Sequence, residues 1–371
     1  MLAHVQRLLL VGLCGCRSIL GIDGAGVAGD APTDDMRPDG PSLCYGTGLL
    51  RVCVDTAAVE PRTISTQILV TTDTDCTFVL PQSGGPDVCV LASTTLAIEA
   101  LGEMRAIGSR PLVLLATETI LVAGSLDLGS YQQVNPGAGA AICAFSSGLS
   151  TGNTQGAGGA AGGSSNAGAG FGGAGGAGEN TNTGGAGLAP FPLSVVRGGC
   201  PGGRGGTAQS SGGLGGAGGG AVYLIAGSSI TVSGTINASG AAGGPPGERS
   251  GGGGGGSGGL IGLDSPVINI QQSASVFALG GGGASGGGAV SQGVAGTEAS
   301  SATIPAGAAV GPSPSGAGGG GSTVMSRAGK TGGVGMAGGG GGGGGGGASG
   351  SVCTTVVVTA GSNIAPLPTS L

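Results

Sequence analysis

"AVYLIAGSSITVSGTINASG" (Ala221–Gly240) repeats the apolar pattern of "LVLLATETILVAGSLDLGS" (Leu112–Ser130). When the two stretches are aligned, Ile230 falls on Ile120, and large apolar residues alternate with small or polar ones in both. A period of two is that of β-strands with one buried face, and the content of Gly, Thr, Ser and Val disfavours helix. Each stretch therefore predicts two or three short strands joined by tight corners.

Other segments fit the same pattern less closely. "VLASTTLAIEALGEMRAIG" places Ala92 in register with Ala116, and "GLDSPVINIQQSASVFAL" places Asp264 in register with Ala226. A partial copy, "SVCTTVVVTAG", follows near the C-terminus, and we expect "TISTQILVTTDT" to open the series. One such unit cannot bury its apolar face alone, so the copies must stack on one another. The predicted fold is all-β, a parallel β-solenoid interrupted by long glycine-rich insertions.

The repeated pattern resembles the right-handed parallel β-helix of the pectate-lyase-like kind at the level of architecture. We assign the solenoid to residues 88–371 and a disulfide-braced N-terminal cap to residues 44–87. The glycine-rich insertions lie at about residues 136–220, 241–259 and 280–350. An insertion in a solenoid leaves at a corner and returns, so the ladder of strands continues around it.

The glycine-rich tracts allow two interpretations. The chain has 94 glycines among 371 residues, in irregular runs that lack the strict threefold period of collagen. Ordering glycine costs much backbone entropy, which favours flexible loops. Runs such as "FGGAGGAG" (171–178) permit packed, threefold polyglycine helices held by backbone contacts between strands. In composition the tracts resemble glycine-rich repeat proteins of bacterial envelopes, including the PGRS type.

Charge and aromatic content exclude one class of partner. The formal net charge is −6, and only 8% of residues are charged and 2% aromatic. An acidic chain without basic clusters or aromatic platforms is unsuited to nucleic acid. After the N-terminus there is no apolar run of about 20 residues, so a second membrane span is not expected.

The N-terminus, "MLAHVQRLLLVGLCGCRS", has the pattern of an export signal, which we assign to residues 1–15. "LCGC" resembles the lipobox of bacterial lipoproteins, although Cys14 occupies a position where that motif usually has a small or β-branched residue. The resemblance implies cleavage before Cys16 and lipidation of its sulfur, and Arg17 implies the outer membrane. Residues 16–43 are rich in Asp, Pro and Gly and are expected to form a flexible tether.

Nine cysteines in an exported chain suggest disulfides. Without Cys14 and Cys16 seven remain, and proximity favours the pairs Cys44–Cys53, Cys76–Cys89 and Cys143–Cys200. Cys353 is then the odd thiol. His4, in the signal, is the only histidine and there is no Cys-x-x-Cys pair, so we expect neither a zinc site nor a Cys–His nucleophile, and no cofactor.

Acidic residues are the remaining candidates for chemistry. No two acids recur at one repeat position, so we expect no catalytic residues, and Asp127, Glu103 and Glu118 are only weak candidates that we interpret as solvated surface acids. Asp73 and Asp75 in "TTDTDCTF" suit part of a calcium site. The glycine and distal glutamate of an EF-hand loop are missing, which favours a solvated turn.

The whole chain resembles uncharacterised glycine-rich lipoproteins of Gram-negative bacteria, a group that implies no activity. We therefore expect a non-catalytic envelope lipoprotein with a structural, adhesive or surface-display role, at the outer membrane or cell surface. Its expected partners are the membrane, through the lipid anchor, and an envelope or extracellular glycan or protein. The alternative is a carbohydrate-binding or degenerate polysaccharide-lyase-like module.

Overall fold

The computed structural model describes residues 42–55, 59–132, 136–140, 175, 185–186, 193–336, 341–358 and 363–371. Residues 41–371 form one compact unit, and the other unit, residues 1–40, lies outside the described residues, as does the expected lipidation site Cys16. The described residues form strands β1 to β20 and no helix, so the all-β prediction is confirmed. Accordingly, that part of the chain has no helix of the length and apolarity that crossing a membrane requires.

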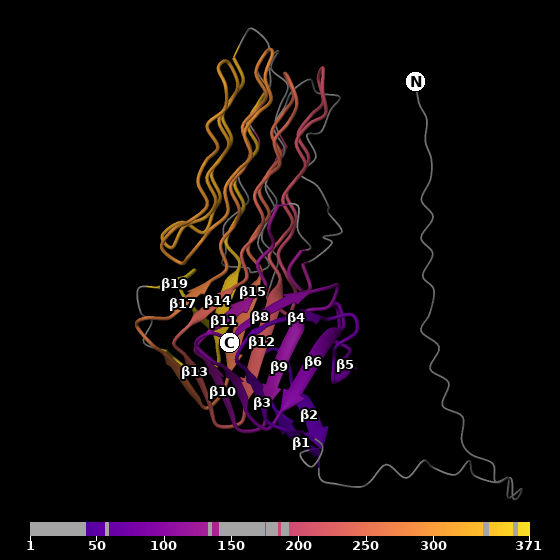
Figure 1. The fold of residues 1–371 in the computed structure, drawn as a ribbon, viewed down its shortest axis with the longest axis vertical. Helices are drawn as coiled ribbons and strands as arrows, with labels where there is room; N and C mark the ends of the chain where they lie inside the picture. Colours follow the sequence, from indigo (N-terminus) through magenta and orange to yellow (C-terminus); the bar gives the residue numbers. More distant parts are fainter. Residues whose placement is uncertain are drawn as a thin grey trace, which may run out of the picture. The chain divides into compact units, whose positions relative to one another are not determined.

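Three sheets, built almost entirely from parallel pairs, make up the body of the unit (Figure 1). The five-stranded sheet contains, in order, β16 (Val267–Ile270), β13 (Ser229–Val232), β10 (Thr119–Val122), β7 (Leu96–Ile98) and β3 (Arg62–Ile64). The six-stranded sheet contains β19 (Ile364–Ala365), β17 (Ser275–Phe277), β14 (Thr235–Asn237), β11 (Ser125–Asp127), β8 (Glu103–Ile107) and β4 (Gln67–Thr71). The seven-stranded sheet contains β20 (Thr369–Ser370), β18 (Ser351–Thr354), β15 (Leu260–Asp264), β12 (Ala221–Ala226), β9 (Leu112–Ala116), β6 (Val88–Ser93) and β5 (Phe78–Leu80), of which β5 pairs antiparallel to β6. An antiparallel hairpin of β1 (Ser42–Tyr45) and β2 (Val52–Asp55) is separate from these sheets.

The chain visits the three sheets in a repeating order, from the seven-stranded to the five-stranded to the six-stranded sheet. Each pass lays one strand beside its predecessor, so that Ile230 pairs with Ile120 and Asn237 with Asp127. The alignment of the two opening stretches is confirmed by this register. β3 and β4 join the same parallel sheets, as expected for the segment "TISTQILVTTDT".

Two register assignments made from the weaker copies are wrong by one residue. Ala92 pairs with Leu115 rather than with Ala116, and Asp264 pairs with Ile225 rather than with Ala226. A shift of one residue moves a side chain to the other face of a sheet. Both errors fall on the seven-stranded sheet, where apolar residues do not alternate with polar ones and the period therefore carries no information on register.

The absence of alternation has a structural cause, because the seven-stranded sheet is buried on both faces. All residues of β9, β12 and β15 are buried. One face joins the main core, which includes Leu114 and Leu224, and the other face packs against the hairpin residues Val52 and Val54. Continuous apolar strands are typical of parallel sheets covered on both sides.

The cysteine pairing agrees with the proximity argument where it can be checked. Cys44–Cys53 joins the hairpin strands, and Cys76–Cys89 ties the loop before β5 to β6. Cys200 is also disulfide-bonded, and its expected partner Cys143 lies outside the described residues. Cys353 is free and buried, and burial raises the pKa of its thiol.

The described glycine-rich segments pack as a bundle of extended strands, seen in Figure 1 as orange, yellow and pink traces lying side by side. In the strand 251–259, backbone N–H groups that are three residues apart donate to the same neighbouring strand. Gly252, Gly255 and Gly258 donate at 2.9 Å to Gly342, Gly345 and Ala348. The other two sets donate to Gly206, Gly203 and Cys200, and to Gly244, Ala241 and Ala238.

A partner that recurs every third residue means that the strand turns once per three residues, as in the polyproline-II helix. The packed, threefold interpretation of the glycine tracts is therefore confirmed for the described residues, and the flexible-loop interpretation is wrong there. Most of the first tract, residues 141–174, 176–184 and 187–192, lies outside the described residues.

The position of a strand in the bundle explains its sequence. Residues 251–259 are all buried among neighbours, and a Cβ atom on Gly255 or Gly258 would collide with backbone atoms. At the periphery, the strand 201–207 places Pro201, Arg204 and Thr207 on every third position, facing outward or partly outward. An interior strand has neighbours on all three sides and leaves room only for small side chains such as that of Ser257, whereas a peripheral strand has one free side.

All three insertions begin after a strand of the six-stranded sheet and end before a strand of the seven-stranded sheet. Their last residues, Gly220, Gly259 and Gly350, directly precede β12, β15 and β18. Because successive strands stack in register, the insertions leave one above the other at the same corner of the body. This common exit brings tracts that are far apart in the sequence into one bundle.

Candidate functional site

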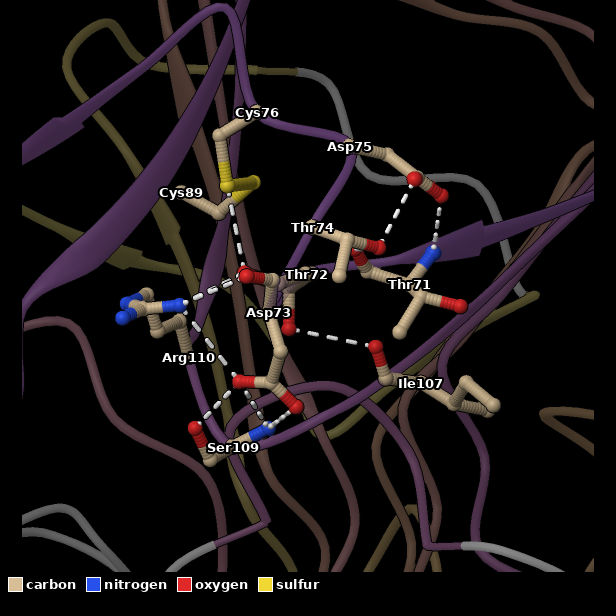
Figure 2. A network of polar contacts seen from close by, with 10 residues as sticks. All are labelled: Thr71, Thr72, Asp73, Thr74, Asp75, Cys76, Cys89, Ile107, Ser109 and Arg110. Atoms are coloured by element: carbon tan, nitrogen blue, oxygen red, sulfur yellow. Dashed lines mark hydrogen bonds and ion pairs between the residues drawn. A yellow bond between two sulfur atoms is a disulfide. The ribbon is translucent and has the colours of Figure 1, made fainter.

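The expected calcium-binding residues lie in a turn after β4, shown in Figure 2. The Asp73 carboxylate accepts hydrogen bonds from the Ser109 hydroxyl at 2.5 Å and backbone N–H at 3.1 Å, and lies 3.5 Å from the Arg110 guanidinium. Asp75 points elsewhere and accepts from the backbone N–H of Thr71 at 2.7 Å and the hydroxyl of Thr74 at 2.9 Å.

The pKa values of both carboxyls reflect these donors. The Ser109 hydroxyl lowers the pKa of Asp73 below its ordinary value, with further lowering by the Ser109 N–H and the Arg110 charge. The Thr71 N–H and the Thr74 hydroxyl lower the pKa of Asp75. The two carboxylates hold different parts of the turn and do not converge on a common point, so the geometry agrees with the solvated-turn interpretation.

Asp127, the first candidate for catalysis, belongs to a polar cluster on the outer face of the six-stranded sheet. It lies between Arg105 and Asn237 in adjacent strands. Arg105 forms an ion pair with Asp127, whose other oxygen accepts hydrogen bonds from Tyr131 and Asn237 at 3.0 Å and from the Gly129 N–H at 2.9 Å. Asp127 is 8% exposed, so its interpretation as a solvated acid is wrong.

The members of the cluster are bonded to one another. The Arg105 guanidinium lies 4.9 Å from the centre of the Tyr131 ring, in cation–π geometry. Burial and the neighbouring Asp127 carboxylate raise the pKa of Tyr131. The Tyr131 hydroxyl and the Gly129 N–H both donate to Asp127, and these bonds fix the chain after β11.

Glu103 and Glu118 do not join Asp127. Glu103 accepts a hydrogen bond from the Gln67 side chain at 3.2 Å at the sheet surface. Glu118 is exposed at the corner between β9 and β10. Glu103 lies two residues before Arg105, the strand partner of Asp127, whereas Glu118 lies at the corner that precedes β10.

Asp264, at the end of β15, is a second buried carboxylate, and it is not among the candidates predicted from the sequence. It is 2% exposed and accepts hydrogen bonds from the Thr47 N–H at 2.7 Å, the Gly48 N–H at 2.9 Å and the Tyr223 hydroxyl at 3.1 Å. The Tyr223 oxygen accepts in turn from the Leu49 N–H at 2.9 Å. Burial and the Asp264 charge raise the pKa of Tyr223.

Asp264 thus holds the loop between β1 and β2 against the seven-stranded sheet. The signal for this role was a single acid in an otherwise apolar strand, "LIGLD". The one-residue register error concealed it, because it placed Asp264 opposite Ala226, on the face of the sheet that lines the main core.

The third candidate is a surface, the bundle tip, formed by the ends of the glycine-rich hairpins. Its described residues are 207–211, 245–250, 288–293, 310–315 and 334–336. Backbone hydrogen bonds join these ends to one another, from Gly247 to Ser211, from Gly293 to Pro246, from Arg249 to Gly288 and from Met336 to Pro314.

The bundle tip carries side chains that the interior of the bundle lacks. Val290 is 85% exposed, Val310 80% and Met336 68%. Its charges are Glu248, which is exposed, and Arg249, which has a left-handed backbone with φ of 56°. Neither side chain forms an ion pair within the described residues, and the Arg249 Nε is buried without a hydrogen-bond acceptor.

Within the described ranges, no three His, Cys, Asp or Glu side chains gather closely enough to hold a metal ion. Comparisons of the chain with protein-family models, with curated proteins and with solved structures find no match.

Proposed function

We propose that this chain is a non-catalytic lipoprotein of the bacterial cell envelope, anchored through Cys16, that displays the bundle tip away from the membrane. The observation that carries the proposal is the polarity of the described unit. The bundle runs into the seven-stranded sheet at the start of β15, at Leu260, whereas the β1–β2 loop binds Asp264 at the other end of that strand. The β1–β2 loop and the bundle thus contact opposite ends of the sheet.

The body suits a display role if its three sheets form a β-solenoid. Three observations support that architecture, namely parallel pairing in register, the repeating order of visits to the three sheets, and one apolar core enclosed by strands of all of them. In this proposal the coils are of the right-handed parallel β-helix kind. Stacked coils provide a firm base because each strand is fixed by both neighbours.

The bundle suits the same role because it is held by regular backbone hydrogen bonds. Loops on a rigid scaffold are the usual site of binding in proteins. Glycine makes such a bundle slender, since neighbouring strands approach without side chains between them. The side chains available for contact are then concentrated at the periphery and at the tip.

The test measures lipidation of Cys16 and exposure of the tip separately in a Gram-negative host. We expect a radiolabelled fatty acid to enter the native protein and the Cys14→Ala control but not Cys16→Ala. A protease site inserted after Gln209 in the tip should be cleaved on intact cells for the native form. Absence of label in the native protein, or protection of the inserted site on intact cells with cleavage after lysis, would overturn the proposal.

The alternative, a carbohydrate-binding or degenerate lyase-like module, has one observation in its favour. The outer face of the six-stranded sheet presents Arg105, Asp127 and Tyr131 together. A glycan array of purified protein tests it, with Asp127→Ala as the variant. Binding that is lost in Asp127→Ala while the fold is kept would favour this module over display, and no binding by the native protein would remove it.

A further inference from the structure

The bundle tip carries exposed apolar side chains and two charges that form no ion pair within the described residues. Val290, Val310 and Met336 gain free energy if another apolar surface covers them. Other exposed apolar side chains, such as Leu214, lie along the sides of the bundle. At the tip they lie on hairpin ends that backbone hydrogen bonds join to one another, which suits a contact surface.

The charges of the tip point to a second copy of this chain. The whole chain has a net charge of −6, so two copies repel each other at long range. The described tip residues include one acid and one base, the adjacent Glu248 and Arg249, and are therefore neutral as a set. In a twofold contact each residue meets its counterpart reciprocally, so Glu248 of one copy can face Arg249 of the other.

Arg249 adds a second observation. A non-glycine residue with φ of 56° is uncommon, and backbones of this kind cluster at sites of contact and function. Its N–H donates to Gly288 at 2.9 Å, which fixes the turn, while the Nε has no acceptor in the described residues. Arg249 is partly exposed, so a carboxylate of a second copy can pair with its charge.

We propose that the bundle tip binds the bundle tip of a second copy, head to head, with Glu248 and Arg249 pairing reciprocally around the exposed Val290, Val310 and Met336. This inference rests on the proposed function, because tips displayed outward from two envelopes can meet in this way. The contact between two slender tips is small, so single copies bind weakly and many copies on one surface bind together.

The experiment uses beads that carry the purified full-length chain at high density, which reproduces the multivalent arrangement without cells. We expect native beads to clump with one another, and clumping to fall by at least about tenfold for Glu248→Arg beads and for Arg249→Asp beads, because each variant brings like charges together. Aspartate is chosen at position 249 because it tolerates a left-handed backbone.

The decisive arm mixes the two variants. Glu248→Arg presents two bases and Arg249→Asp presents two acids, so mixed beads should clump at a rate close to that of native beads. Glu99→Arg, which changes the charge by the same amount at an exposed turn after β7, serves as the matched control and should clump like the native protein.

The outcomes separate the possibilities. Failure of native beads to clump, unchanged clumping in the single variants, or failure of the mixture to recover would each overturn the head-to-head contact. Misfolding of one variant cannot imitate the expected result, since recovery in the mixture requires both variants to be folded. If native beads clump but the protease site inserted in the tip is protected on intact cells, the head-to-head contact holds for the purified chain and outward display is rejected.

Discussion

The body and the bundle both bury their backbone, but different interactions stabilise the two regions. In the body, large apolar side chains such as Leu224 fill the space between sheets, and burial of apolar area is the main stabilising contribution. In the bundle, strands such as 251–259 have almost no side chains, and each N–H group donates to one of three neighbouring strands. Large apolar side chains specify the body, whereas the near absence of side chains specifies the bundle.

This difference predicts opposite responses to substitution. Removing atoms harms the body, because a cavity remains where a side chain was. Adding atoms harms the bundle, because there is no room between backbones that touch. Glycine loses more conformational entropy on folding than any other residue, so the bundle forms only if nearly all of its backbone groups are paired.

The largest effect is expected for Leu224→Ala, compared with Leu214→Ala. Leu224 is fully buried in the main core, whereas Leu214 lies on the bundle and is 64% exposed. We expect the free energy of unfolding to fall by about 2–5 kcal/mol for Leu224→Ala and by less than about 0.5 kcal/mol for Leu214→Ala. Urea unfolding followed by far-ultraviolet circular dichroism measures both, and equal losses would contradict the distinction between the two regions.

The next effect compares two adjacent glycines of the bundle. A Cβ atom on Gly319 would collide with the Lys330 carbonyl oxygen and lie 2.7 Å from the Gly346 nitrogen, whereas on Gly320 its nearest neighbour is 3.6 Å away. We expect Gly319→Ala to lower the free energy of unfolding by about 1–3 kcal/mol. Gly320→Ala should raise it by about 0.4–1 kcal/mol, because alanine reduces the conformational entropy of the unfolded chain. Similar effects of the two variants on thermal unfolding would show that the bundle is not packed in this register.

A smaller effect is expected where the hairpin meets the body. Tyr223→Phe removes the hydroxyl that donates to Asp264 and accepts from the Leu49 N–H, at a cost of about 1 kcal/mol. Hydrogen exchange should become faster at residues 47–49. Tyr131→Phe removes a hydroxyl from the Asp127 cluster and should leave hydrogen exchange at residues 47–49 unchanged. Equal acceleration at these residues in both variants would show that the loss of stability is global.

The smallest effect concerns the turn in Figure 2, which depends on side-chain donors rather than on either mode of packing. Ser109→Ala should raise the pKa of Asp73 toward its ordinary value of 3.8, because the Ser109 hydroxyl is the main cause of the lowering. A carboxyl whose pKa is lowered by folding stabilises the fold above its ordinary pKa and loses this contribution as the pH falls below it. A carboxyl titration by NMR checks the shift, with Thr74→Ala, which should act on Asp75 alone, as the control.

The sequence predicted the paired strands well and the polar sites poorly. The alternation around Ile120 and Ile230 fixed the faces of their strands, and the repeat fixed their pairing. Asp264 was placed on the wrong face, because β15 is buried on both faces. The spacing of its apolar residues therefore does not show which face each residue occupies. Asp127 was interpreted as a solvated acid, because its partners Arg105 and Asn237 become its neighbours only when the strands stack.

By itself, the sequence determined that the described residues are all-β and that the copies pair in parallel. These features follow from side-chain period and repetition, which are local. Only the tertiary structure decided that the insertions pack together and which glycine contacts which. Glycine has no side chain to specify a partner, so the choice was made by the common corner from which the tracts leave the body and by the requirement that each buried N–H group find an acceptor.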